Sequence, residues 1–203
     1  MKPDLPIILL AAGAAARMRG RDKLLELVDG VSLLRRQAEM ARRVTTGPVL
    51  VTLPPPPHAR YAELEGVDVT KIIVPNPEEG MNASIRAGFA ALPDGTERAM
   101  VLLADLPELT EGDLNDVVQA AVSNRKFRIT RGMTDDGKQG HPIIFAAPLF
   151  HELTRLTGDS GGREVVAQNA DSINLVPLPG QHARRDLDTP EDWAAWRREN
   201  PDR

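Results

Sequence analysis

Short apolar segments without polar alternation constrain the fold of this chain more than any other feature. They span residues 6–11, 49–53, 71–74, 100–104 and 173–177. A strand with one face in water alternates polar and apolar residues, so strands without alternation have both faces covered. Between them, apolar residues recur with a period of about 3.6, which is typical of helices. Alternating strands and helices predict an α/β fold with a mostly parallel sheet and helices on both faces.

The region from residue 126 to residue 145 departs from this alternation. Residues 126–132 and 143–145 have the composition of strands, and the turn-rich segment between them contains Asp136-Gly137. An Asp-Gly pair favours a hairpin turn. We therefore expect a small antiparallel excursion on the parallel sheet. The chain has 203 residues, and a single domain over residues 1–203 is the expected organisation.

Composition excludes several classes of protein. The chain contains no cysteine, which excludes disulfide scaffolds, thiolate zinc sites and thiol nucleophiles. Its 25 basic and 29 acidic residues give a net charge of −4, which argues against a protein that coats nucleic acid. The apolar run near the N-terminus is too short to span a bilayer, and it is followed by arginines rather than by a cleavage site. We expect a cytoplasmic protein that binds neither nucleic acid nor membrane.

The loop after the first strand consists mostly of small residues and carries two cations. Small side chains let backbone N–H groups approach a ligand closely, and such groups with nearby cations bind polyphosphates. Neither common glycine-rich phosphate motif occurs here, and the alternative is an alanine-rich helix start packed under the sheet. The candidate residues are Leu10, Ala11, Ala12, Gly13, Arg17 and Lys23.

Two acidic positions are candidate metal ligands. Asp105 follows a buried strand, at the C-terminal end where α/β sheets bind ligands. Mg²⁺ is usually held by one or two carboxylates together with substrate phosphates. Asp186 and Asp188 lie on one face if their segment is extended. The alternative is that these carboxylates cap the turn before Pro107 and the helix that starts after Thr189.

Three further polar residues are candidates for substrate contact. Asn82 and Ser84 lie in the first turn of a predicted helix, where free N–H groups favour anions. They would either cap that helix or contact a ribose or phosphate. His141 lies in a tight turn before a strand, and a lone histidine is more often structural than substrate-binding.

The segment 158–162 has the sequence Gly-Asp-Ser-Gly-Gly, which copies the nucleophile motif of trypsin-like serine proteases. Those proteases are all-β, and their serine requires a positioned histidine and aspartate. Here the segment lies between two helical patterns. We interpret it as a turn between two helices.

In their order along the chain, these motifs together resemble the MobA-like nucleotidyltransferases, and among them the molybdenum cofactor cytidylyltransferases. The resemblance implies a single Rossmann-like domain that transfers a nucleoside monophosphate from an NTP to a phosphorylated acceptor, releases pyrophosphate and uses Mg²⁺. The matching motifs are Leu10-Ala-Ala-Gly13, Arg17-Met18, Lys23-Leu-Leu25, Gly80-Met-Asn-Ala-Ser-Ile-Arg86, Leu103-Ala-Asp105-x-Pro107, Gly140-His-Pro142, Gly158-Asp-x-Gly-Gly-Arg163 and Asp186-Leu-Asp188-Thr-Pro-Glu-Asp192.

The resemblance also implies roles for individual residues. The implied catalytic residues are Arg17, Lys23 and Asp105, and the implied metal ligands are Asp105 and Asp188. The implied acceptor contact is His141. The implied nucleotide contacts are Leu10, Ala11, Ala12, Gly13, Arg17, Lys23, Asn82 and Ser84.

The same resemblance favours particular substrates. The loop sequence Leu-Ala-Ala-Gly accompanies cytidylyl transfer, so CTP is the expected donor. Molybdopterin is the expected acceptor, with hand-over of the product to a molybdoenzyme or its chaperone. The alternatives are a nucleotidylyltransferase acting on a sugar 1-phosphate or another small phosphate, and a maturation factor that binds a nucleotide or cofactor without turnover. The chain departs from the family pattern at two places. Arg19 stands between Met18 and Gly20, so the loop either carries an extra residue or shifts its glycine. Position 162 is glycine, where the family has alanine.

Overall fold

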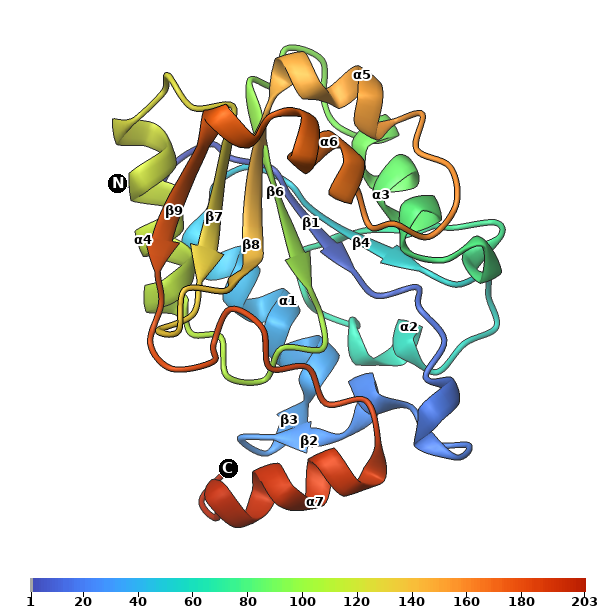
Figure 1. Cartoon of the computed structure of the whole chain (residues 1–203). Helices are drawn as coiled ribbons and strands as arrows, with labels where there is room; N and C mark the ends of the chain where they lie inside the picture. Colours follow the sequence, from blue (N-terminus) through green and yellow to red (C-terminus); the bar gives the residue numbers. More distant parts are fainter. Residues whose placement is uncertain (1) are drawn as a thin grey trace.

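A seven-stranded sheet forms the centre of the structure, a computed structural model that describes residues 2–203 (Figure 1). Its strands are β1 (Ile7–Leu10), β4 (Val49–Leu53), β5 (Thr70–Ile73), β6 (Arg98–Leu103), β7 (Ile129–Met133), β8 (Gln139–Ala146) and β9 (Ile173–Pro177). Their order is β5-β4-β1-β6-β8-β7-β9. β8 pairs antiparallel with β6 and β7, and the other four pairings are parallel. The predicted α/β fold with a small antiparallel excursion is therefore confirmed.

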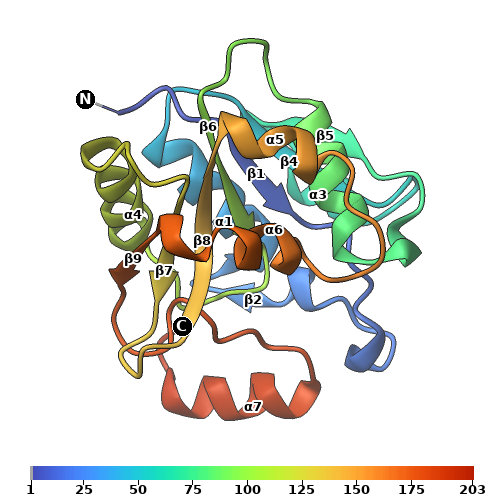
Figure 2. The same cartoon turned by 45° about the horizontal axis from the view of Figure 1, so that its top comes forward.

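Helices cover both faces of the sheet. They are α1 (Leu33–Val44), α2 (Arg60–Glu63), α3 (Met81–Ala90), α4 (Glu111–Ser123), α5 (Phe150–Leu153), α6 (Arg163–Gln168) and α7 (Pro190–Glu199). In Figure 2, α3, α5 and α6 lie in front of the sheet. Residues of β1 alternate between the two faces of the sheet, because successive side chains of a strand point to opposite sides. Ile7 and Leu9 belong to the core cluster of α1 and α4, whereas Ile8 and Leu10 belong to that of α3, α5 and α6.

The parallel strands end on the side of the molecule where α7 lies (Figure 1). Beside α7 is a small hairpin that the sequence analysis did not predict, formed by β2 (Leu27–Val28) and β3 (Val31–Ser32). Arg197 of α7 lies 2.6 Å from the Glu26 carboxylate, which joins the helix to the segment before the hairpin. The C-terminal helix therefore closes over the edge of the sheet at which α/β proteins bind ligands.

The start of α7 is fixed by its cap and by its buried face. Thr189 and Asp192 form a capping box, in which each side chain accepts a hydrogen bond from the backbone N–H of the other. Such a cap is worth about 1 kcal/mol. Trp193 and Trp196 are both fully buried in the core cluster of α1 and α4. Because Asp188 immediately precedes the capping residue, this anchoring also fixes the position of its carboxylate.

Among residues 2–203, no helix combines the length and the apolar character needed to cross a membrane.

Candidate active site

Three residues that are far apart in the sequence meet beyond the C-terminal ends of β1 and β6. Lys23 Nζ lies 2.5 Å from Asp105 Oδ2 and 2.6 Å from Asp188 Oδ1. Arg17, whose side chain is largely exposed, reaches the same cluster, with Nη2 lying 2.5 Å from Asp188 Oδ2. The structure therefore brings together all four charged residues to which the sequence analysis gave catalytic or metal-binding roles.

A buried arginine fixes the backbone on which Lys23 lies. Asp22 caps the short 3₁₀ helix that begins at Lys23 by accepting a hydrogen bond from Leu24 N–H. Arg60, of which 2% is exposed, donates to both carboxylate oxygens of Asp22, at 2.7 and 2.9 Å, and to the carbonyl oxygen of Ala11 at 2.6 Å. Arg60 thus links both ends of the loop after β1. Arg60 was not predicted, because nothing in the sequence of a short helix after a proline-rich segment signals a buried arginine.

Lys23 and Asp188 hold each other in their ionised forms. Burial alone would lower the pKa of Lys23, but the carboxylates of Asp105 and Asp188 raise it above its ordinary value. Burial alone would raise the pKa of Asp188, but Lys23 and Arg17 lower it. Partial burial and the charges of Asp188 and Asp105 raise the pKa of the neighbouring Asp186. Lys23 is therefore the cation that lies between Asp105 and Asp188.

The donor set of this cluster fits a divalent cation. Oδ1 of Asp105 is buried and has no hydrogen-bond partner among the described residues. A buried carboxylate oxygen without a partner is costly unless a donor or cation satisfies it. Within residues 2–203, no group of three or more His, Asp or Glu side chains is placed to hold a metal ion. Asp105 and Asp188 would therefore supply two protein ligands and leave the rest to phosphate and water oxygens, as Mg²⁺ prefers.

The loop after β1 lines a cavity of about 680 Å³. Its walls come from the small residues 12–16, from 20–22 and from the segment 54–60. Within the described chain, no protein acceptor takes a hydrogen bond from the N–H groups of residues 12–16. By contrast, Leu10 is buried in the core, and Ala11 N–H donates to Thr52 O at 3.0 Å. The free N–H groups of the loop therefore begin at Ala12.

Asn82 and Ser84 lie in the first turn of α3, and both are buried. Asn82 Nδ2 donates to Thr157 O at 2.7 Å, and Asn82 Oδ1 accepts from Gly162 N–H at 3.1 Å. In return, Asp159 Oδ1 accepts from Met81 N–H at the start of α3, at 2.5 Å. These contacts bind the turn between α5 and α6, which lies between two helices as predicted, to the start of α3. Contact of Asn82 and Ser84 with the nucleotide stays a prediction.

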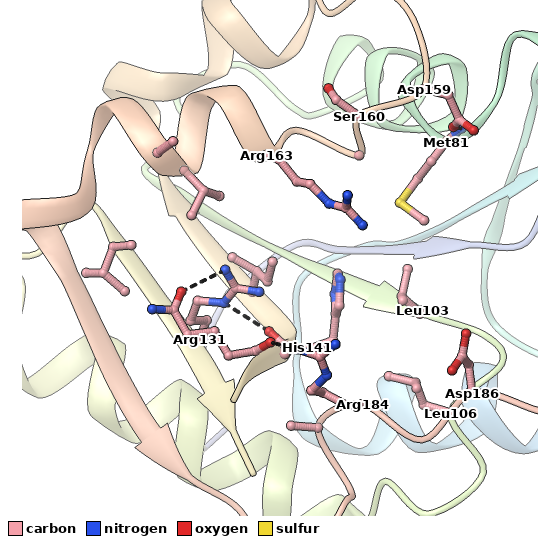
Figure 3. Close-up of a pocket in the computed structure, with 18 of the residues that line it drawn as sticks. Met81, Leu103, Leu106, Arg131, His141, Asp159, Ser160, Arg163, Arg184 and Asp186 are labelled. Atoms are coloured by element: carbon pink, nitrogen blue, oxygen red, sulfur yellow. Dashed lines mark hydrogen bonds between the residues drawn. The ribbon is translucent and has the colours of Figure 1, made fainter. Parts of the chain in front are cut away.

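A second cavity, of about 600 Å³, lies over β6, β8 and β7 (Figure 3). His141 lies within β8, which begins at Gln139, and the prediction of a tight turn before a strand is wrong. Its side chain points into the cavity, and Arg131, Arg163, Arg184 and Asp186 contribute to the walls. Burial lowers the pKa of His141 to about 4, so its imidazole is neutral at physiological pH. Its Nδ1 is buried and has no hydrogen-bond partner within the described chain. The cavity thus offers a neutral histidine and several guanidinium groups to a ligand.

Sequence comparison relates the chain to known nucleotidyltransferases. The family model described as the MobA-like NTP transferase domain matches residues 7–173. The molybdenum cofactor guanylyltransferase of Burkholderia cenocepacia (strain HI2424) is 33% identical over 169 residues, which cover 79% of this chain and 76% of that protein. The purine catabolism protein PucB of Bacillus subtilis (strain 168) is 26% identical over 210 residues, 97% of each chain. The phosphoenolpyruvate guanylyltransferase of Sanguibacter keddieii is 31% identical over 126 residues, but this match spans 60% of the chain and less than half, 43%, of that protein.

Solved structures share the fold. Rv0371c from Mycobacterium tuberculosis H37Rv superposes with a TM-score of 0.80 at 23% sequence identity, covering 96% of this chain and 97% of that one. A complex of Rv0371c with manganese superposes with a TM-score of 0.77 at 22% identity, covering 95% and 97%. Together, the matched family model, the related sequences and the shared fold establish that the chain is a nucleotidyltransferase belonging to the MobA-like NTP transferase domain family.

Proposed function

We propose that this nucleotidyltransferase transfers CMP from CTP to the phosphate of a molybdopterin-type acceptor, releases pyrophosphate and depends on Mg²⁺. The observation that carries the proposal is the position of the cluster of Lys23, Asp105 and Asp188 relative to the two cavities. Asp22, next to Lys23, lines the cavity with the free N–H groups, and Asp186, two residues before Asp188, lines the cavity with the arginines. A nucleotide in the first cavity and an acceptor in the second would meet at the cluster.

The first cavity has the chemistry of a nucleotide site. The free N–H groups of the loop would bind phosphate oxygens, with Arg17 and Lys23 at the triphosphate. A Mg²⁺ ion held by Asp105 and Asp188 supplies positive charge that offsets the charge of the phosphates. The manganese complex of the structural relative supports a divalent ion in this fold.

In the transfer step, an oxygen of the acceptor phosphate attacks the α-phosphorus of CTP. A new P–O bond forms there, the bond to the β-phosphate oxygen breaks, and pyrophosphate leaves. The attacking oxygen is already an anion, so no general base is required. The work of the protein is in-line positioning and electrostatic stabilisation. Arg17 and Lys23 would stabilise the charge that builds on the leaving pyrophosphate.

The catalytic unit would extend beyond the family match, which ends at residue 173. Asp188 lies after that residue, and its position depends on the capped start of α7. We therefore include all of residues 1–203 in one catalytic domain.

A pyrophosphate-release assay tests the function directly. Each of CTP, GTP, ATP and UTP is offered with molybdopterin, glucose 1-phosphate or phosphoenolpyruvate in the presence of Mg²⁺. We expect release with CTP and molybdopterin, and loss of about a thousandfold or more in Asp105→Asn, because a main metal ligand is removed. Asp171→Asn, an exposed carboxylate outside both cavities, is the control.

The other outcomes distinguish the alternatives. Release of pyrophosphate with GTP and molybdopterin would mean that the donor is GTP and not CTP. Release with a sugar phosphate or phosphoenolpyruvate would replace the acceptor. Nucleotide binding without release from any pair would indicate a maturation factor.

A further inference from the structure

The second cavity contains arginine side chains whose positive charges are not neutralised by nearby carboxylates. Arg131 of β7, Arg163 of α6 and Arg184 all line it (Figure 3). Within residues 2–203, none of the three guanidinium groups lies within 4.0 Å of a carboxylate oxygen. The cavity also contains two carboxylates, but neither pairs with these arginines. Asp159 accepts a hydrogen bond from the backbone at the start of α3, and Asp186 lies beside Asp188.

Two of these arginines are held side by side. Arg131 Nε donates to Gly140 O at 3.1 Å, and its Nη1 donates to Gln139 Oε1 at 3.2 Å. Arg184 Nη1 donates to the backbone oxygen of the same Gln139 at 3.2 Å. Burial and the nearby charge of Arg184 lower the pKa of Arg131 to about 10. Two fixed cations without a counter-ion repel each other, and a bound anion removes that cost.

Arg131 lies away from the site of phosphoryl chemistry. Asp105 follows β6, whereas Arg131 is on β7, and β8 separates the two strands. Two strand spacings separate the strand of Arg131 from the strand that leads to Asp105 by about 10 Å across the sheet. The lining of the cavity also has apolar side chains, among them Leu103, Leu106 and Ile143.

We propose that the acceptor has two anionic ends, with its attacking phosphate directed toward the cluster of Lys23, Asp105 and Asp188 and a second anionic group bound by Arg131 and Arg184. An uncharged or apolar body would lie between them. Arg163, which points into the cavity opposite His141 (Figure 3), would face that body or the nearer phosphate. This inference rests on the proposed function in one respect only, namely that the second cavity is the acceptor site.

The test uses simple probes and requires no turnover. Isothermal titration calorimetry compares 1,6-hexanediol bisphosphate with hexyl monophosphate on the whole protein in the presence of Mg²⁺. A bidentate guanidinium–phosphate contact predicts that the bisphosphate binds about tenfold or more tightly than the monophosphate. Arg184→Met and Arg131→Lys should each remove most of that advantage.

A matched control is Arg198→Met, which removes an exposed arginine of α7 outside both cavities. It should keep the full advantage of the bisphosphate. Thermal unfolding monitored by circular dichroism checks that each variant is folded, and Arg184 is exposed, so its replacement spares the core. Equal affinity of the wild type for the two probes would overturn the inference, as would an advantage that survives both arginine substitutions.

The result is independent of nucleotidyl transfer. A protein that prefers the bisphosphate through Arg131 and Arg184 but releases no pyrophosphate in the four-nucleotide assay would contradict the proposed function alone. A protein that releases pyrophosphate but binds both probes equally would contradict the second anion site alone.

Discussion

The ammonium nitrogen of Lys23 lies 2.5 Å from Oδ2 of Asp105. In the proposed reaction, Lys23 binds the triphosphate and Asp105 binds the metal ion. The ion pair between the two residues must therefore open before either can bind its ligand. Asp188, 2.6 Å from the same nitrogen, completes the contact. Binding of a divalent cation at these carboxylates therefore has to compete with Lys23.

This competition predicts opposite effects of Lys23→Met on metal binding and on turnover. Without nucleotide, Mn²⁺ should bind about tenfold more tightly to the variant, because removal of the ammonium leaves two carboxylates without their cation. In the same variant kcat should fall by about a hundredfold, since the leaving pyrophosphate loses a stabilising charge. Electron paramagnetic resonance of free Mn²⁺ measures the first effect and steady-state kinetics the second.

The control for Lys23→Met is Lys138→Met, which removes an exposed lysine that pairs with Asp136. Neither metal affinity nor kcat should change in it. Unchanged or weaker Mn²⁺ binding in Lys23→Met would contradict the competition, and an unchanged kcat would remove Lys23 from the catalytic residues.

Arg60 should contribute strongly to stability. Arg60→Met leaves Asp22 without its buried partner, and breaking a buried ion pair from one side costs about 3–5 kcal/mol. Arg43→Met removes an exposed partner of Glu111 and should cost less than about 1 kcal/mol. Urea denaturation gives the free energy of unfolding of both variants. Similar losses in the two would mean that Arg60 is a surface contact in solution.

The sequence could predict the residues whose roles depend only on their position at the end of a strand. Asp105 follows a buried apolar run, and Lys23 follows the loop after the first strand, so the common edge of a parallel sheet brings them together. Asp188 was predicted from its motif, and the structure adds the physical reason for its position, which is the capped and buried start of α7.

The remaining parts of the site depend on contacts between distant segments, and the sequence carries no local signal for them. Arg60 resembles any arginine in a short helix until its contacts with Ala11 and Asp22 are known. Arg131 and Arg184 are 53 positions apart and meet only because both contact Gln139. Asn82 had the pattern of a helix-start residue, and only the packing of α3 on the turn after α5 makes it a buried anchor.

The neutral His141 predicts a dependence of stability on pH. Its pKa in the folded protein is about 4, below the value of about 6.5 in an unfolded chain. Between these values the unfolded state binds more protons, so the free energy of unfolding rises with pH. The stabilisation is complete above about pH 6.5 and is lost as the pH falls toward 4, by about 2–3 kcal/mol.

Urea denaturation at pH 7.0 and pH 4.5 of the wild type and His141→Asn measures this contribution. The wild type should lose about 2 kcal/mol more than the variant between the two pH values. His151→Asn, a substitution of an exposed histidine, should lose as much as the wild type. A pH dependence that His141→Asn leaves unaltered would mean that the imidazole is solvated or ion-paired in the folded state.

Ala12 is the residue at which the choice of base can be tested. It is 3% exposed and lines the proposed nucleotide cavity. Its methyl group narrows the site and restricts the backbone relative to glycine, which should admit a pyrimidine and crowd a purine. One methyl group gives about 1–3 kcal/mol of discrimination, so we expect kcat/KM to favour CTP over GTP by about 10- to 100-fold. Ala12→Gly should reduce this ratio by about tenfold, mainly by improving the use of GTP.

The control for this substitution is Ala14→Gly in the same loop. Ala14 lines the same cavity but is exposed, so its replacement increases the freedom of the backbone and removes a methyl group only from the part of the wall that faces solvent. If Ala14→Gly changed the ratio as much as Ala12→Gly, loop flexibility rather than the methyl group would determine the preference. A wild-type preference for GTP would instead align the protein with the related guanylyltransferases. It would leave the proposed phosphate chemistry of Lys23 and Asp105 unchanged, because those residues would contact the part of the substrate that all four nucleotides share.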